Sequence, residues 1–129
     1  MLRAKAGAPS HPELQLTVDV QKRLVIVRIA HKVTAADLER LGRELRHHPG
    51  FESDFSEIAD LTEMDDIDLK AEEMLTLADT IDPFSARARR AFVVRTTSQR
   101  YFARMHRTLH PANIEIFESV EEAQRWLDS

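Results

Sequence analysis

Four consecutive apolar residues, Ala91 to Val94, constrain the fold more than any other feature of this sequence. They stand between Arg90 and Arg95 and include a phenylalanine and two valines, which favour β-strands. Because successive strand residues face opposite sides of a sheet, the unbroken run predicts a strand that is buried on both faces. Such a strand is typical of a parallel sheet that is covered by helices.

The first half of the chain predicts a hairpin, a helix and a third strand. Apolar and polar residues alternate from Leu14 to Val20, and a second strand is expected at Leu24–Ile29 after a short polar break. Thr34–Asp37 is similar to a capping box and predicts the start of a helix, which His47–Gly50 ends. Phe55–Leu61 is the expected third strand.

The second half predicts three further helices and two further strands. Asp68 is expected to cap a second helix, which ends at Asp82–Pro83. A third helix follows the Ala91–Val94 strand, and Ile114–Phe117 is the last strand before the capping box Ser119–Glu122 starts a fourth helix. This order predicts an α/β fold: a single-layer, mixed and mainly parallel five-stranded sheet with four helices.

The length of the chain, 129 residues, fits one domain. Residues 1–12 contain Gly7, Pro9 and Pro12 and are expected to form a disordered N-terminal tail, with the domain at residues 13–129. No apolar run reaches the ~20 residues that a membrane span needs, and the N-terminus lacks the apolar stretch of a signal peptide. We therefore expect no membrane insertion and a cytoplasmic location.

The residue content disfavours most kinds of catalytic site. With no cysteine, the chain has no thiolate metal site, disulfide or thiol nucleophile. With three glycines it has no glycine-rich phosphate loop, and its serines lack a nucleophile elbow. The sequence predicts no metal site, no cofactor and no catalytic residue, and nothing in it argues for an enzyme.

The charges are divided into two blocks. Glu52–Asp82 holds twelve acids and one base, whereas Ala86–His110 holds seven arginines and no acid. A net charge of −4 and the acidic block argue against a nucleic-acid partner. The two blocks are expected to pair within the molecule or between two copies of it, which makes a homodimer one interpretation.

Two histidines, His106 and His110, are four residues apart and share a helix face as metal-binding pairs do. Arg107 would repel a cation, and a third ligand is missing. We interpret both as exposed side chains near the end of a helix, where a positive charge favours the helix dipole.

Four stretches in order resemble the SpoIIAA-like family of small bacterial proteins with a STAS-like fold. The resemblance covers roughly Leu14 to Leu127 and rests on Val33–Leu38, Ile58–Thr62, Arg90–Val94 with Phe102–Met105, and Ile116–Phe117 with Glu121–Ala123 and Trp126–Leu127.

The resemblance implies a non-enzymatic binding or protein-interaction module, regulatory in some relatives. Relatives that act as anti-sigma-factor antagonists carry a phosphorylatable serine in an Asp-Ser-Ser-Gly pattern. Here the matching stretch is Asp68–Ala71, where only the aspartate agrees, so a phosphorylation switch is not supported. The chain also has His31 where a glycine is expected before the first helix.

The predicted binding site lies between the acidic segment Asp60–Asp68, expected as a turn, and the start of the third helix. Ligands of parallel sheets gather at the carboxyl ends of strands, and a helix N-terminus attracts anions. The alternative is that Ser98 only caps the helix and the arginines only pair with acids. Asp60 and Thr62 are expected to orient a polar group, and the donors are expected from Thr97, Ser98, Arg100 and Arg104.

A second hypothesis is a carrier of a small hydrophobic or anionic ligand. Its cavity is expected among Met74, Phe92, Phe102 and Met105, which are equally ordinary core positions. The expected partner is therefore an unidentified protein or a small anionic or hydrophobic molecule.

Overall fold

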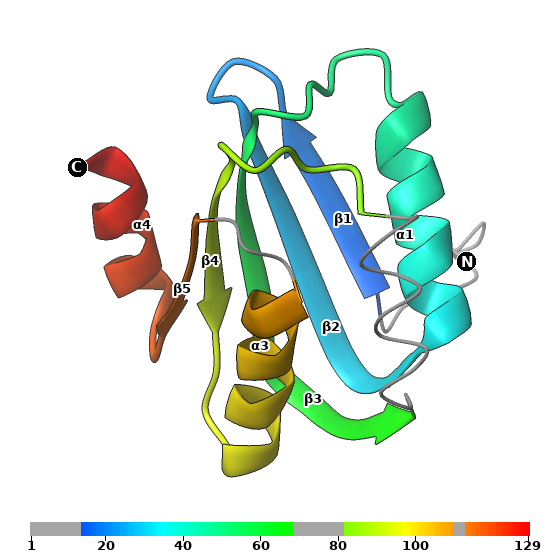
Figure 1. The fold of residues 1–129 in the computed structure, drawn as a ribbon, viewed down its shortest axis with the longest axis vertical. Coiled ribbons are helices and arrows are strands. Elements are labelled where there is room, and N and C mark those ends of the chain that lie inside the picture. The colour runs from blue at the N-terminus through cyan, green and yellow to red at the C-terminus, as the bar shows by residue number, and fades with distance from the viewer. Residues whose placement is uncertain (1–13, 69–81, 110–112) are drawn as a thin grey trace, which may run out of the picture.

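A computed structural model describes residues 14–68, 82–109 and 113–129, which form one five-stranded mixed sheet with helices on both faces (Figure 1). The strands lie in chain order, β1-β2-β3-β4-β5. The β1–β2 pair is antiparallel, and the other three neighbouring pairs are parallel. The elements are β1 (Leu14–Asp19), β2 (Leu24–Thr34), α1 (Ala35–His47), β3 (Ser56–Asp68), β4 (Arg89–Val93), α3 (Thr97–Leu109), β5 (Asn113–Phe117) and α4 (Val120–Asp128).

The five predicted strands and three of the four predicted helices are present. The expected helix from Asp68 to Asp82 falls mainly on residues 69–81, which lie outside the described residues, as does the expected tail. The domain boundary at residue 13 and the second helix therefore stay predictions. Thr34 caps α1 as expected, since its hydroxyl accepts from the backbone of Asp37 and the Asp37 carboxylate accepts from the backbone of Thr34.

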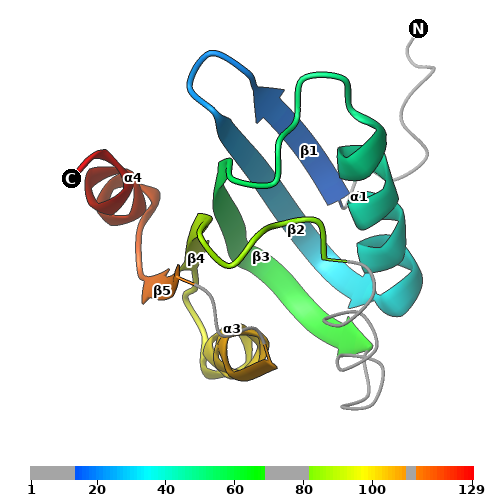
Figure 2. The ribbon, with the colours of Figure 1, turned by 45° about the horizontal axis from the view of Figure 1, so that its top comes forward.

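The two faces of the sheet carry different helices (Figures 1 and 2). Leucines of α1 and the Phe102–Ala103 pair of α3 pack on one face, against Val25 and Val27 of β2. Ala123, Trp126 and Leu127 of α4 pack on the other face, beside Ile58. Val120, the first residue of α4, is exposed.

The Ala91–Val94 run is buried on both faces, as predicted. All four residues are at most 3% exposed. Ala91 and Val93 belong to the core under α4, whereas Phe92 and Val94 belong to the core under α1 and α3. The sheet alternation thus divides one apolar run between two cores.

The acidic segment from Asp60 to Asp68 is a strand, not the expected turn. β3 continues to Asp68, and β2 extends beside it to Thr34. The sequence predicts that β3 ends near Leu61 and that β2 ends near Ile29. The ladder between the two strands supplies backbone hydrogen bonds that the local residue types do not reveal. Two register shifts interrupt it. The first lies between the pairs Arg28–Asp60 and Ala30–Glu63, and it lets both Leu61 and Met64 enter the core although they are three residues apart.

His31 lies at one of these register shifts and has a φ of 64°, in the left-handed region. Glycine enters this region without steric cost, whereas a residue with a Cβ is strained there. The structure therefore explains why the resemblance places a glycine at this position.

Candidate functional site

Two strands place opposite charges side by side beneath α1 and α3. Glu57 of β3 and Arg90 of β4 are direct partners in the parallel ladder, so their side chains leave the sheet on the same face. The Nε of Arg90 donates to Oε1 of Glu57 across 2.8 Å. Both side chains are about 95% buried, at 4% and 5% exposure.

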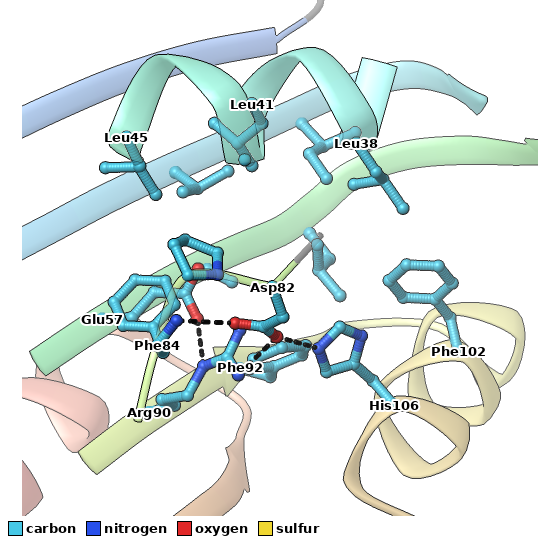
Figure 3. A pocket seen from close by; sticks show the side chains of 16 residues that line it. Leu38, Leu41, Leu45, Glu57, Asp82, Phe84, Arg90, Phe92, Phe102 and His106 are labelled. Carbon is cyan, nitrogen blue, oxygen red and sulfur yellow. Dashed lines mark hydrogen bonds and ion pairs between the residues drawn. The ribbon is translucent and has the colours of Figure 1, made fainter. Parts of the chain in front are cut away.

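Asp82 joins this pair from the segment that leads into β4. Its Oδ2 accepts from Nη1 of Arg90 at 2.8 Å, and its Oδ1 accepts from the backbone N–H of Phe84 at 2.9 Å (Figure 3). Arg90 also lies over the Phe84 ring, 4.5 Å from its centroid. The guanidinium is therefore held between two carboxylates and an aromatic face.

His106 of α3 completes the cluster. Its Nε2 lies 3.4 Å from Oδ2 of Asp82, and its ring centroid lies 5.2 Å from that of Phe92 and 6.4 Å from that of Phe102. The side chain is only 19% exposed, so the expectation of an exposed histidine that serves the helix dipole is wrong. The helix stripe that carries Phe102 and Met105 turns His106 inward as well.

Burial and neighbouring charges move the pKa values of this cluster in different directions. Burial raises the pKa of the Glu57 carboxyl above its ordinary value; the Arg90 charge only partly offsets this, and the Asp82 charge adds to it. Burial also acts to raise the pKa of Asp82, but His106 and Arg90 outweigh it and hold that pKa well below its usual range. Asp82 is therefore ionised at neutral pH.

A cavity of about 70 Å³ lies above this cluster, between α1 and the sheet (Figure 3). The charged cluster forms one side of its wall, and the other described residues of the wall are almost wholly apolar. The apolar lining comes from Val27, Ile29, Leu38, Leu41, Leu45, Ala59, Leu61, Phe84, Phe92 and Phe102, together with Gly42 and Pro83.

The arrangement suits binding of a small apolar molecule with a polar end. The apolar wall would exclude water from the ligand body, and the cluster would orient a polar group. Among the described residues we find no group of three or more histidine and acidic side chains placed to hold a metal ion.

Of the predicted site residues, Asp60 and Thr62 lie at the end of the β3–β4 ladder. The Asp60 carboxylate accepts hydrogen bonds from both the backbone and the hydroxyl of Thr62. The Thr62 carbonyl accepts from the side chains of Arg95 and Gln99. The structure therefore brings the middle of β3, at Thr62, to the start of α3.

The other four predicted residues lie on the outer side of α3. Thr97, Ser98 and Arg104 are exposed, whereas Arg100 is half-buried and forms an ion pair of 2.9 Å with Glu118. The capping role falls not on Ser98 but on Thr96, whose hydroxyl accepts from the backbone N–H of Gln99. Whether the six residues bind a ligand stays a prediction.

Sequence reasoning missed Gln99, which is 1% exposed. Its Oε1 accepts from the backbone N–H groups of Arg95 and Thr96, and its Nε2 donates to the carbonyls of Thr62 and Met64. The Thr96-x-x-Gln99 spacing of a capping box is the signal that could have indicated it.

Sequence reasoning also missed Glu57, Asp82 and Arg90 as a cluster. The predicted pairing between the acidic and basic blocks pointed toward it, and Arg87 with Asp54 is a second such pair, at 3.1 Å. Which members of the blocks meet depends on strand register, and a single sequence does not reveal register.

The comparisons with known proteins agree with this fold. The sequence pattern of the SpoIIAA-like family matches residues 24–128. The chain belongs to the SpoIIAA-like family. One similar structure is that of an uncharacterised protein of the DUF3478 family from Shewanella loihica PV-4, which has a SpoIIAA-like fold. It shares 20% identity with this SpoIIAA-like chain at a TM-score of 0.61, over 88% of this chain and 91% of the other.

No curated protein matches the chain. In the part of the SpoIIAA-like chain that the structure describes, no helix is both long enough and apolar enough to span a bilayer. The cytoplasmic location, the homodimer and the absence of a nucleic-acid partner stay predictions.

Proposed function

We propose that this SpoIIAA-like chain is a non-enzymatic binding module that holds a small, mainly apolar molecule between α1 and the sheet. The cavity of about 70 Å³ carries the proposal. Protein interiors are packed about as densely as organic crystals, so an apolar space of this kind is a binding-site candidate. A single water needs roughly 10–15 Å³, and an engineered cavity of about 150 Å³ binds benzene. The space therefore suits a few heavy atoms or one end of a longer molecule.

This proposal develops the carrier hypothesis drawn from the sequence. Phe92 and Phe102 line the cavity as that hypothesis expects, and Met105 packs against the same core. Met74 lies outside the described residues.

Xenon is a suitable first probe because it is apolar, compact and free of hydrogen bonds. Methyl-detected NMR under xenon pressure should shift the signals of Val27, Leu41 and Leu45 in a saturable way. In Ala59→Leu, the added side chain fills the space above β3, and these shifts should disappear. Ala36→Leu is the matched control, because it adds the same atoms at an exposed position of α1.

A second apolar replacement, Leu41→Phe, narrows the cavity from α1 instead of from the sheet. It keeps the experiment informative when Ala59→Leu overpacks the core. Wild-type signals that do not respond to xenon, or shifts that persist unchanged in both folded variants, contradict the proposal.

The six residues predicted from the sequence are a second candidate, for an anion or an acidic protein partner at the start of α3. One observation favours this second candidate. Thr97, Ser98 and Arg104 have exposed side chains close to Gln99, whose side chain donates a hydrogen bond to the Thr62 carbonyl of β3. Asp60, Thr62 and Arg100 already have partners, which leaves these three as the residues to test.

A further inference from the structure

Among the described residues, one of the two carboxyl oxygens of Glu57 has a hydrogen-bond partner and the other has none. Oε1 accepts from Nε of Arg90 at 2.8 Å, and the structure gives the Glu57 side chain no other hydrogen bond among the described residues. The side chain is 5% exposed and belongs to the cavity wall. In Figure 3 the second oxygen is directed toward α1, on the opposite side of the carboxyl group from Arg90.

On the cavity wall this oxygen accepts no hydrogen bond from the described residues, although a carboxylate oxygen has the lone pairs to accept one. The neighbouring donor does not remedy this, since Nη1 of Arg90 is directed to Asp82. His106 likewise contacts Asp82, at 3.4 Å. A donor that enters the cavity is therefore the partner that this oxygen lacks.

The charges around the cavity favour a donor that carries no negative charge. The cluster places two carboxylates, Glu57 and Asp82, around the guanidinium of Arg90, and His106 also lies beside Asp82. A carboxylate or phosphate would bring a third negative charge beside them in a poorly hydrated space. An alcohol or an amine adds a donor without that repulsion.

We propose that the cavity selects a small apolar molecule that carries one hydrogen-bond donor, an alcohol or a primary amine, and that Glu57 accepts this hydrogen bond. The inference rests on the proposed function, because it requires that the cavity admits a ligand. It adds the chemical class of the ligand and the residue that recognises it.

Four compounds of one chain length test this selectivity on the unaltered protein: 1-butanol, butylamine, butanone and butyrate. Methyl NMR titrations at a single pH should give dissociation constants at least tenfold lower for the alcohol or the amine than for butanone and butyrate. The alcohol and amine arms then distinguish a neutral donor from a charged one. Equal binding of all four, or tightest binding of butyrate, overturns the inference.

Glu57→Gln gives a sharper form of the test. Arg90 Nε needs an acceptor, so the glutamine carbonyl oxygen takes the place of Oε1 and the amide NH₂ faces the cavity. The amide NH₂ then offers a donor that both the ketone oxygen and the hydroxyl oxygen can accept, so butanone should gain affinity and the preference for butanol over butanone should be lost. A folded Glu57→Gln variant that keeps the wild-type preference contradicts the role of Glu57.

Xenon separates the failure of this inference from failure of the proposed function. Saturable xenon shifts without selectivity among the four compounds leave the apolar site in place and remove the role of Glu57. An absence of both responses overturns both.

Discussion

Arg90 and Glu57 are 33 residues apart in the chain, yet Nε of Arg90 lies 2.8 Å from Oε1 of Glu57 inside the core. The parallel pairing of β3 with β4 puts them opposite each other. A buried ion pair is weak evidence for added stability, because desolvation opposes the attraction, but removal of one partner leaves an uncompensated buried charge. The cluster is therefore a place where single substitutions have large effects.

Arg90→Met should destabilise the fold by about 3–5 kcal/mol, because Glu57 would lose its cation and Asp82 would lose Arg90 while keeping its contact with His106. Urea unfolding measures the change. Arg87→Met is the matched control, since Arg87 is 83% exposed in its pair with Asp54 and should contribute at most about 1 kcal/mol. Equal losses in the two variants contradict the interpretation of a buried, coupled cluster.

Asp82 should make the folded state sensitive to acid. Its folded pKa is held below the ordinary value, so below about pH 4 the unfolded chain takes up a proton that the folded chain does not. The stability that Asp82 contributes is therefore present above this pH and decreases as the pH falls further. Asp82→Asn should flatten this decrease in unfolding curves recorded at a series of acidic pH values.

Glu57 should change the free energy of unfolding with pH in the opposite direction, in a higher pH range. Burial raises its folded pKa, so above its ordinary value of about 4.3 the folded chain binds a proton before the unfolded chain does. Between the folded and the unfolded pKa of Glu57, the free energy of unfolding therefore increases as the pH falls. The increase ends when Glu57 is protonated in the unfolded chain as well. The difference between wild type and Glu57→Gln isolates this contribution, and a difference that does not change with pH would refute it.

His31→Gly should stabilise the protein by up to about 1 kcal/mol. Relief of the left-handed strain gains about 1–2 kcal/mol, and the entropy of the glycine backbone opposes it by about 0.5–1 kcal/mol. The ion pair with Asp65 that the change removes is exposed, at 3.5 Å, and contributes little. His31→Val, which is β-branched, should destabilise the fold. Thermal unfolding of both variants measures the difference in stability between them. Equal stability of His31→Gly and His31→Val would contradict the interpretation that the backbone is strained at residue 31.

Arg104→Ala tests the site predicted at the start of α3. Arg104 is exposed, so the variant should keep its thermal stability within about 0.5 kcal/mol. Titration with inorganic phosphate should shift the backbone amide signals of Thr97 and Ser98 in the wild type and shift them less in the variant. Phosphate shifts of equal size in both proteins remove Arg104 from the site.

The sequence by itself determined the element types of the described chain. The alternation at β1, the apolar Ala91–Val94 run and the capping residues Thr34 and Ser119 are local signals, because backbone propensity and side-chain periodicity act within a few residues. The same periodicity indicated Phe92 and Phe102, two residues of the cavity wall.

Only the tertiary structure decided how far β2 and β3 extend and which charges meet. The acidic residues after Leu61 have the composition of a turn, and the ladder with β2 makes them a strand. Glu57, Asp82, Arg90 and His106 come from four segments of the chain and form one cluster only through strand register and the inward face of α3. Register and packing are interactions between segments distant in sequence, so they are specified by the whole fold and not by any local pattern.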